Sequence, residues 1–410
     1  MNSAAGNGRK PAGQLAGIRV LDLTNVLSGP YATYQMAMLG AEVIKVENPR
    51  EGDLARKLGA SSALNQAMMG TSFLAQNAGK KSVTIDLKHP EGKSLFVELL
   101  ATADVLIENF RPGVMDRLGF GYEAVRAIKP TIIYCAISGF GQIGPLSANP
   151  AYDQIIQGLS GVMSITGDVQ SAPLRVGYPM CDTLGGMGAA FAIVSALLGR
   201  ERTGDGAFID LSMLDSTISA MGWAVSNYLI AGVEAKPIGN QNMTAAPSGS
   251  FACADGQINI AANQQEQFER LCRLIGRAEL IDDPRFAERE ARKANRAAIN
   301  AEINTALATR SAAEWEELLN ANAIPAGRIL TVPEVLAHPQ IVARELIQEL
   351  PIDEAGLESV KVVRAGFAFG DSQPGAQTPP PMLGAHNTEI FGALGKDEVS
   401  LAALKAGGVI

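Results

Sequence analysis

The segments Ile18-Arg-Val-Leu-Asp-Leu23 and Ala41-Glu-Val-Ile-Lys-Val-Glu47 decide the fold class of this chain. Both are short, rich in β-branched residues and apolar at alternate positions, which is typical of strands. Residues 31–39 between them are helical in pattern, and Gly40 ends that pattern. A strand, a helix and a second strand form a βαβ unit, which predicts a parallel sheet covered by helices.

The same alternation of strand and helix continues along the first 200 residues. Further strands are predicted at 82–87, 104–108 and 131–138, and helices at 91–102, 122–127 and 184–198. We therefore expect a large, doubly wound α/β domain that resembles the Rossmann fold.

The regular alternation of predicted strands and helices ends after Asp210. Residues 211–231 predict one long helix, and a smaller α+β unit follows, with strands at 250–253 and 257–261 and helices at 264–274, 288–309 and 312–321. A strand over 360–369 and a helix over 388–394 close the chain. The predicted division is a disordered tail (1–14), the first part of the large domain (15–210), a linker helix and loop (211–249), the small domain (250–322), a return linker (323–350) and the C-terminal part of the large domain (351–410).

The composition excludes several classes of function. A net charge of −8 over 410 residues argues against a nucleic-acid-binding surface. The four cysteines are scattered, which favours a reducing, cytoplasmic location. The apolar run 187–198 is too short to span a bilayer, so we expect no membrane association. With three histidines and no paired His or Cys ligands, we expect no metal and no serine-hydrolase triad.

Asp182 is the only charged residue between Gly177 and Gly199. It precedes the apolar helix predicted at 184–198, so we expect it at the helix N-cap, where unpaired N–H groups and the helix dipole favour a carboxylate anion. Two interpretations stay open on these grounds. Asp182 is either a cap alone or an ionised nucleophile or base in an uncharged pocket.

Two segments lie where a dinucleotide-binding motif is expected, but neither has all the features of that motif. The turn of the first βαβ unit, residues 24–30, has a single glycine, which does not allow the close approach that a pyrophosphate needs. Residues 139–144 match GxGxxG, but Pro145 follows and no helix begins there. A nicotinamide-dependent oxidoreductase is therefore a weak alternative.

The loop that follows strand 104–108 is a stronger ligand candidate, because ligands bind at the carboxyl ends of parallel strands. It offers an aromatic ring for stacking, two guanidinium groups for phosphates and apolar lining: Phe110, Arg111, Arg117, Val114 and Leu118. Lys80 adds a point charge from a neighbouring strand. Such a set suits an adenine nucleotide with several phosphates; a solvated basic loop is the other interpretation.

Taken together, the ordered segments of the chain resemble the family III CoA-transferases, a superfamily that includes the α-methylacyl-CoA racemases. The segments that carry the resemblance are Leu15-Ala-Gly-Ile-Arg-Val-Leu-Asp-Leu-Thr24, Gly40-Ala-Glu-Val-Ile-Lys-Val-Glu47, Gly52-Asp53, Asn77-Ala-Gly-Lys-Lys-Ser82, Asp104-Val-Leu-Ile-Glu-Asn-Phe-Arg-Pro-Gly113, Ser138-Gly-Phe-Gly-Gln-Ile-Gly-Pro145, Tyr152-Asp153 and Thr203-Gly-Asp-Gly206.

The resemblance implies a role for particular residues. It makes Asp182 the covalent nucleophile and places the CoA nucleotide against Val26, Lys80, Asn109, Phe110, Val114, Arg117 and Leu118. We add Arg111 from the same loop, and Leu27, Gly141, Gln142 and Tyr152 as candidates for the acyl pocket. It also implies an interlocked homodimer, a CoA-binding domain built from both chain ends, and acyl-CoA as substrate with no permanently bound cofactor.

The identity of residue 152 bears on which of the superfamily's two activities, CoA transfer or racemisation, is expected. The racemases use a His and an Asp as acid–bases, and Tyr152 stands where that His would be. A phenol with a pKa of about 10 is a poor proton carrier at neutral pH, so transfer is favoured over racemisation. Residues 240–250 lack the glycine run of the oxalate-specific members, and Leu27 replaces a polar residue. We expect a small dicarboxylate such as succinate as donor or acceptor.

Overall fold

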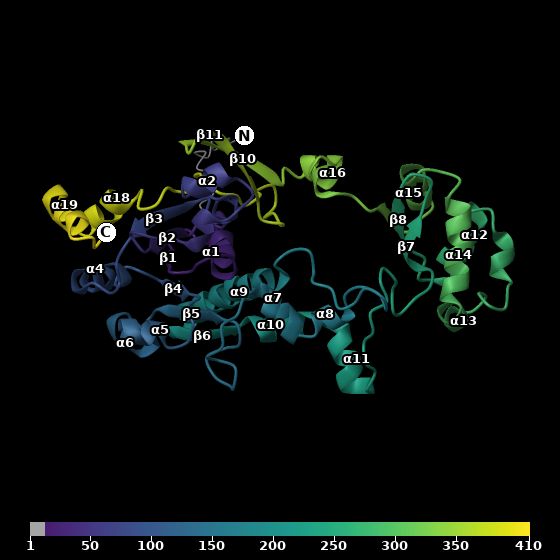
Figure 1. Cartoon of the computed structure of the whole chain (residues 1–410), viewed down its shortest axis with the longest axis horizontal. Coiled ribbons are helices and arrows are strands. Elements are labelled where there is room, and N and C mark those ends of the chain that lie inside the picture. Colours follow the sequence, from purple (N-terminus) through teal and green to yellow (C-terminus); the bar gives the residue numbers. More distant parts are fainter. Residues whose placement is uncertain (1–12) are drawn as a thin grey trace, which may run out of the picture. The chain divides into compact units, whose positions relative to one another are not determined.

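The computed structural model describes residues 13–410, so residues 1–12 of the predicted tail lie outside it. The chain divides into two compact units (Figure 1). Unit 1 comprises the chain up to Gly161, Val176–Ala231 and Gln340–Ile410, and unit 2 comprises Val162–Arg175 and Gly232–Pro339. Unit 1 is thus built from both ends of the chain, and unit 2 extends beyond the predicted small domain 250–322 on both sides.

Unit 1 is organised around a six-stranded sheet in the order β3-β2-β1-β4-β5-β6, in which every neighbouring pair is parallel. This confirms the predicted parallel α/β class. The strands are β1 (Arg19–Asp22), β2 (Glu42–Glu47), β3 (Lys80–Thr84), β4 (Val105–Glu108), β5 (Ile133–Ser138) and β6 (Ala207–Ser212). A two-stranded antiparallel sheet, β10 (Ile347–Glu354) and β11 (Leu357–Val363), is separate from it.

Helices cover the sheet and surround it. Those in unit 1 are α1 (Ser28–Met38), α2 (Ser62–Gln66), α3 (Thr71–Leu74), α4 (Pro90–Leu100), α5 (Val114–Leu118), α6 (Tyr122–Ile128), α7 (Asp153–Leu159), α9 (Met180–Thr203), α10 (Met213–Ala220), α11 (Trp223–Ala231), α18 (Asn387–Ala393) and α19 (Glu398–Ala406). The short α17 (Pro339–Ala343) lies at the boundary, and the 3-10 helix η1 (Leu54–Lys57) follows β2.

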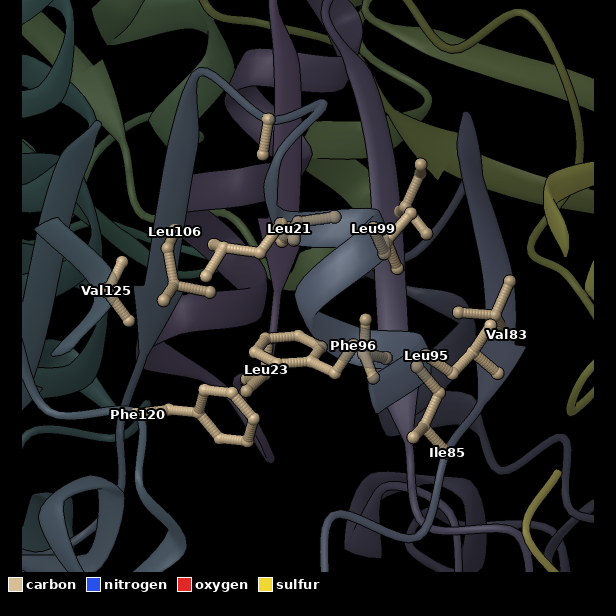
Figure 2. Packing of buried hydrophobic residues seen from close by; sticks show 14 of the residues in the cluster. Leu21, Leu23, Val83, Ile85, Leu95, Phe96, Leu99, Leu106, Phe120 and Val125 are labelled. Carbon is tan, nitrogen blue, oxygen red and sulfur yellow. The ribbon is translucent and has the colours of Figure 1, made fainter. Parts of the chain in front are cut away.

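Alternation along each strand sends side chains to opposite faces of the sheet. Leu21 and Leu106 pack on one face with Phe96 and Leu99 of α4 (Figure 2). Their neighbour Val20 belongs to the core cluster of the other face, which α1 and α9 cover. Because both faces are buried, apolar residues occupy consecutive positions in β1, β4 and β5, and β2 and β3 also carry buried charged residues.

The 24-residue helix α9 extends beyond the predicted 184–198 at both ends. Within the described residues it is the one helix with the length and composition of a membrane span, a test that core helices of water-soluble proteins also pass. One face packs against α1, β5 and β6. Gly185 permits this approach, since a Cβ there would lie 2.9 Å from Ser28 Oγ, and a Cβ on Gly186 would collide with the Ser28 carbonyl.

Two segments that were each predicted to form a single helix instead form more than one element. Residues 211–231 instead contain the end of the edge strand β6, then α10 and α11, which are separated at Gly222 with φ +48°. The predicted helix 288–309 is interrupted at Asn295 and forms two helices. The predicted strand 360–369 is β11, which starts earlier and ends at Val363.

Unit 2 has its own core. Its three-stranded antiparallel sheet has the order β7-β8-β9, and apolar residues such as Phe251, Ile258 and Phe268 fill the space between sheet and helices. The elements are α8 (Val162–Ile165), β7 (Ser248–Ala252), β8 (Gln257–Ala261), α12 (Gln265–Leu274), the 3-10 helix η2 (Ala278–Ile281), α13 (Arg289–Ala294), α14 (Arg296–Leu307), α15 (Ala312–Ala321), β9 (Ala326–Arg328) and α16 (Val332–Leu336).

Candidate active site

A cavity of about 460 Å³ opens in unit 1 at the carboxyl ends of β1, β4 and β5. The strand order reverses between β1 and β4, and open parallel sheets bind ligands at such a switch point. The lining residues are Asn25, Val26, Leu27, Ser28, Glu51, Gly52, Leu54, Lys57, Asn109, Phe110, Arg111, Ile137, Ser138, Gly139, Pro150, Ala151, Tyr152, Asp182 and Met213.

Seven of the residues selected from the sequence meet in this cavity. They come from four separate parts of the chain and are Val26, Leu27, Asn109, Phe110, Arg111, Tyr152 and Asp182. The fold therefore brings the loop after β1, the loop after β4 and the first turn of α9 to one place. Tyr152 lies at the rim with 67% of its surface exposed.

Other predicted residues lie outside this lining. Val114, Arg117 and Leu118 form α5, in which Leu118 packs against the core and Arg117 is exposed. Gly141 and Gln142 belong to the loop after β5, where the Gln142 N–H donates to the Asp210 carboxylate at 3.0 Å. That contact anchors the loop to β6 rather than to a ligand.

Lys80 is buried in the interior of unit 1 and is not part of the cavity lining. Its Nζ donates to Asp22 Oδ2 at 3.0 Å and to Thr33 Oγ1 at 2.7 Å, and two further oxygens, Pro30 O and Asn77 Oδ1, accept from it. Burial lowers the pKa of Lys80 to about 8, while Asp22 opposes this shift. An ammonium group with four protein acceptors is not available to a phosphate.

Lys80 belongs to a buried group of charges that we call the ionic layer. It pairs Lys80 with Asp22 at 3.0 Å, Lys45 with Asp53 at 2.9 Å and Arg56 with Glu47 at 2.6 Å. Each acid in this layer has a basic partner within ion-pair distance, so the layer is electrically balanced.

Asp182 is in a different environment. The N-cap of α9 is Pro179, so Asp182 is the third residue of the helix and the expectation that it is the N-cap was wrong. Asp153 of α7 supplies a carboxylate to this helix end instead, since its Oδ1 accepts from the Cys181 N–H at 2.8 Å. Within residues 13–410, no hydrogen bond or ion pair engages the Asp182 carboxylate, which faces the cavity.

Burial raises the pKa of Asp182 to about 7, and the Asp153 carboxylate adds to that shift. The expectation that the helix N-terminus holds Asp182 fully ionised is therefore not met at neutral pH. A carboxylate with such a pKa is partly protonated near pH 7, and its anion is a more basic nucleophile than an ordinary Asp. Raised pKa values of this kind are typical of functional sites.

Asn109 fixes the loop after β1, which lines the same cavity as Asp182. The Asn109 Oδ1 accepts from the Asn25 N–H at 2.8 Å, and its Nδ2 donates to the Asn25 carbonyl at 2.8 Å. This pair of bonds joins the ends of β1 and β4 across the switch point. Asn109 was predicted to contact a nucleotide, and the structure shows that it also fixes the cavity wall.

The model of CoA-transferase family III matches residues 15–387. The chain belongs to CoA-transferase family III.

Relatives in this family match over most of both chains. A succinyl-CoA:glutarate CoA-transferase of Mus musculus is 37% identical over 97% of this chain and 90% of its own length. An acetyl-CoA:oxalate CoA-transferase of Acetobacter aceti is 42% identical over 82% of this chain and 86% of its own. A crystal structure of a CAIB/BAIF family protein from Brucella suis has a TM-score of 0.82 and 35% identity, covering 93% of this chain and all of that one. This family III chain is a CoA-transferase.

Sequence reasoning missed several lining residues of this CoA-transferase. Glu51, Leu54 and Lys57 follow β2, and Lys57 adds an exposed cation to the cavity. The quoted Gly52-Asp53 motif marks this segment, so its position after a strand was the available signal. Ser28 and Met213 line the cavity from the beginnings of α1 and α10, and no pattern around either residue indicated this.

Proposed function

We propose that this CoA-transferase moves coenzyme A from an acyl-CoA thioester to a free carboxylic acid through a covalent intermediate on Asp182. The observation that carries the proposal is a cavity-facing carboxylate with a pKa of about 7, without a cation partner in the described chain. Nucleophilic catalysis suits this group because a desolvated carboxylate attacks a carbonyl more readily than a solvated one.

The proposed reaction begins when Asp182 attacks the thioester carbonyl, forming a mixed anhydride and releasing CoA thiolate. The thiolate then attacks the aspartyl carbonyl, which releases the donor acid and leaves an aspartyl-CoA thioester. The acceptor carboxylate reverses these two steps and regenerates Asp182. Backbone N–H groups near the cavity wall are the candidates for stabilising each oxyanion.

The cavity lining supports binding of the CoA nucleotide beside this group. Arg111 and Lys57 supply positive charge for phosphates, and Phe110 supplies a ring for adenine stacking. A small dicarboxylate is the proposed acyl group, which the similarity to a succinyl-CoA:glutarate enzyme supports.

We further propose that the enzyme works as an interlocked homodimer. Unit 1 exposes large apolar side chains on α9 and α11, including Phe191 (78%), Trp223 (71%) and Ile230 (86%). Exposed apolar surface of this kind is typical of protein interfaces. The four cysteines are all free thiols, in keeping with a cytoplasmic location.

The experiment that tests this function is a screen of acyl-CoA donors against carboxylic acid acceptors, read by mass spectrometry of the CoA products. We expect a new acyl-CoA only when both partners are present, with succinyl-CoA among the active donors. Deuterium entering the α-carbon from solvent without exchange of acids would instead show a racemase. Tight CoA binding with no exchange would show a binding protein.

A further inference from the structure

The cavity wall contains a strained residue. Val26 has φ +67°, and among the described residues of the lining it is the one non-glycine in the left-handed region. A β-branched side chain is disfavoured there, because its Cβ crowds the neighbouring peptide groups. Such conformations persist only when surrounding contacts impose them, and they concentrate at functional sites.

Asp53 and Lys45 supply those contacts. The Asp53 Oδ1 accepts from the Val26 N–H at 2.9 Å, and its Oδ2 lies 2.9 Å from Lys45 Nζ. The same Nζ donates to the Thr24 carbonyl at 2.7 Å. The two side chains therefore hold the peptide groups on both sides of Asn25, and both are completely buried.

Asp53 is itself fixed on two sides. Its N–H donates to Glu47 Oε2 at 3.0 Å, and its Oδ1 also accepts from the Ala55 N–H at 2.9 Å at the start of η1. Although burial opposes charge, Lys45 holds the pKa of Asp53 below its usual value. The pair is thus ionised and rigidly placed under the loop.

A buried ion pair is a weak source of stability, because desolvation consumes most of the attraction between the charges. Replacing such a pair by apolar residues of similar volume is often neutral or stabilising. Its geometric effect is a better explanation here, since the pair holds the loop that lines the same cavity as Asp182.

We infer that Lys45 and Asp53 are positioning residues of the CoA-transfer site, which hold Val26 in the left-handed conformation and so fix the wall formed by residues 25–28. This inference rests on the proposed binding of CoA in the cavity. Neither residue is in the cavity lining, so both act through the loop.

The test is a double-mutant cycle on CoA affinity. The paired variant Lys45→Met with Asp53→Leu removes both charges, so neither member of the pair is left as an unpaired charge, while the Val26 N–H and the Thr24 carbonyl lose the side chains that hold them. We expect it to weaken CoA binding about tenfold by calorimetry, with a cooperative thermal transition retained. Adding Val26→Gly supplies a residue that adopts positive φ without strain. In that background, removal of the pair should change the Kd less than threefold relative to Val26→Gly alone.

A matched control removes a different pair at the other end of the sheet. Arg200→Met with Asp104→Asn eliminates an ion pair of 3.1 Å before β4 and should leave the Kd unchanged. A tenfold loss that persists in the Val26→Gly background would overturn the inference, as would wild-type affinity in the paired variant. Exchange by the wild-type enzyme is measured in parallel, so failure of the proposed function appears as CoA binding without turnover.

Discussion

The buried Asp22 and the half-buried Asp182 are two acids of unit 1 in opposite electrostatic surroundings. Burial alone raises the pKa of Asp22, but the ammonium groups of Lys45 and Lys80 outweigh it and hold that pKa well below its usual range. Asp182 has no such partner in the described chain, and burial together with Asp153 raises its pKa to about 7. The comparison shows that one unit contains both a layer of paired charges and a separate carboxylate that has no cation partner in the described chain.

The largest expected effect comes from removing the unpaired acid. Asp182→Ala should lower turnover by at least about 1000-fold, because no other group in the proposed mechanism forms the acyl bond. CoA affinity, measured by calorimetry, should stay within about threefold. Asp215→Ala is the matched control, since Asp215 is also the third residue of its helix but is exposed. Retained turnover in Asp182→Ala would contradict the mechanism.

Removing a cation from the ionic layer should lower the free energy of unfolding. Lys80→Met leaves Asp22 buried with a weakened set of partners, which should lower the free energy of unfolding by about 3–5 kcal/mol in urea melts. Lys81→Met changes the adjacent lysine, whose partners are the half-buried Glu42 and the exposed Glu389, and should cost less than about 1 kcal/mol. Equal effects of the two variants would break the comparison.

The pH dependence of turnover should follow the ionisation of Asp182. In the proposed mechanism turnover requires ionised Asp182, so the rate should rise with pH through about 7, falling about tenfold per pH unit on the acid side. Asp153→Asn keeps an acceptor for the Cys181 N–H but removes the negative charge, so the midpoint should move to lower pH. An unchanged midpoint would show that Asp153 does not tune Asp182.

The smallest expected effect is a gain in stability. Because the folded pKa of Asp182 is raised, the native state binds a proton more tightly than the unfolded chain, and stability falls as pH rises from about 4 to about 7. Asp182→Asn avoids that loss and should raise the Tm by a few degrees at pH 8. The difference should vanish near pH 4; a lower Tm at pH 8 would contradict this assignment.

The sheet and much of the cavity were predictable from local patterns. The alternation of strand and helix patterns predicted β1 to β5. The rule that ligands bind after parallel strands indicated the loop at Asn109. The edge strand β6 was missed because its polar residues, such as Asp210, obscure the alternation, and the segment after it is helical. Local pattern alone does not distinguish such a strand from the start of a helix.

The roles of charged residues were less predictable, since they depend on contacts between distant positions. Lys80 pairs with Asp22, 58 residues earlier, and this burial is invisible in the sequence around either residue. The carboxylate at the start of α9 likewise comes from Asp153, 28 residues before Cys181. The sequence pattern therefore placed Asp182 at the N-cap, where Asp153 supplies the carboxylate contact instead, and the chemical role of Asp182 stays a prediction.

Covalent trapping tests the central claim most directly. The enzyme is incubated with succinyl-CoA and hydroxylamine, digested, and analysed by peptide mass spectrometry. The account predicts a hydroxamate on Asp182 alone, formed only when the thioester is present and absent from Asp182→Asn. Sustained exchange between acids with an unmodified Asp182, or with the label on another residue, would contradict it.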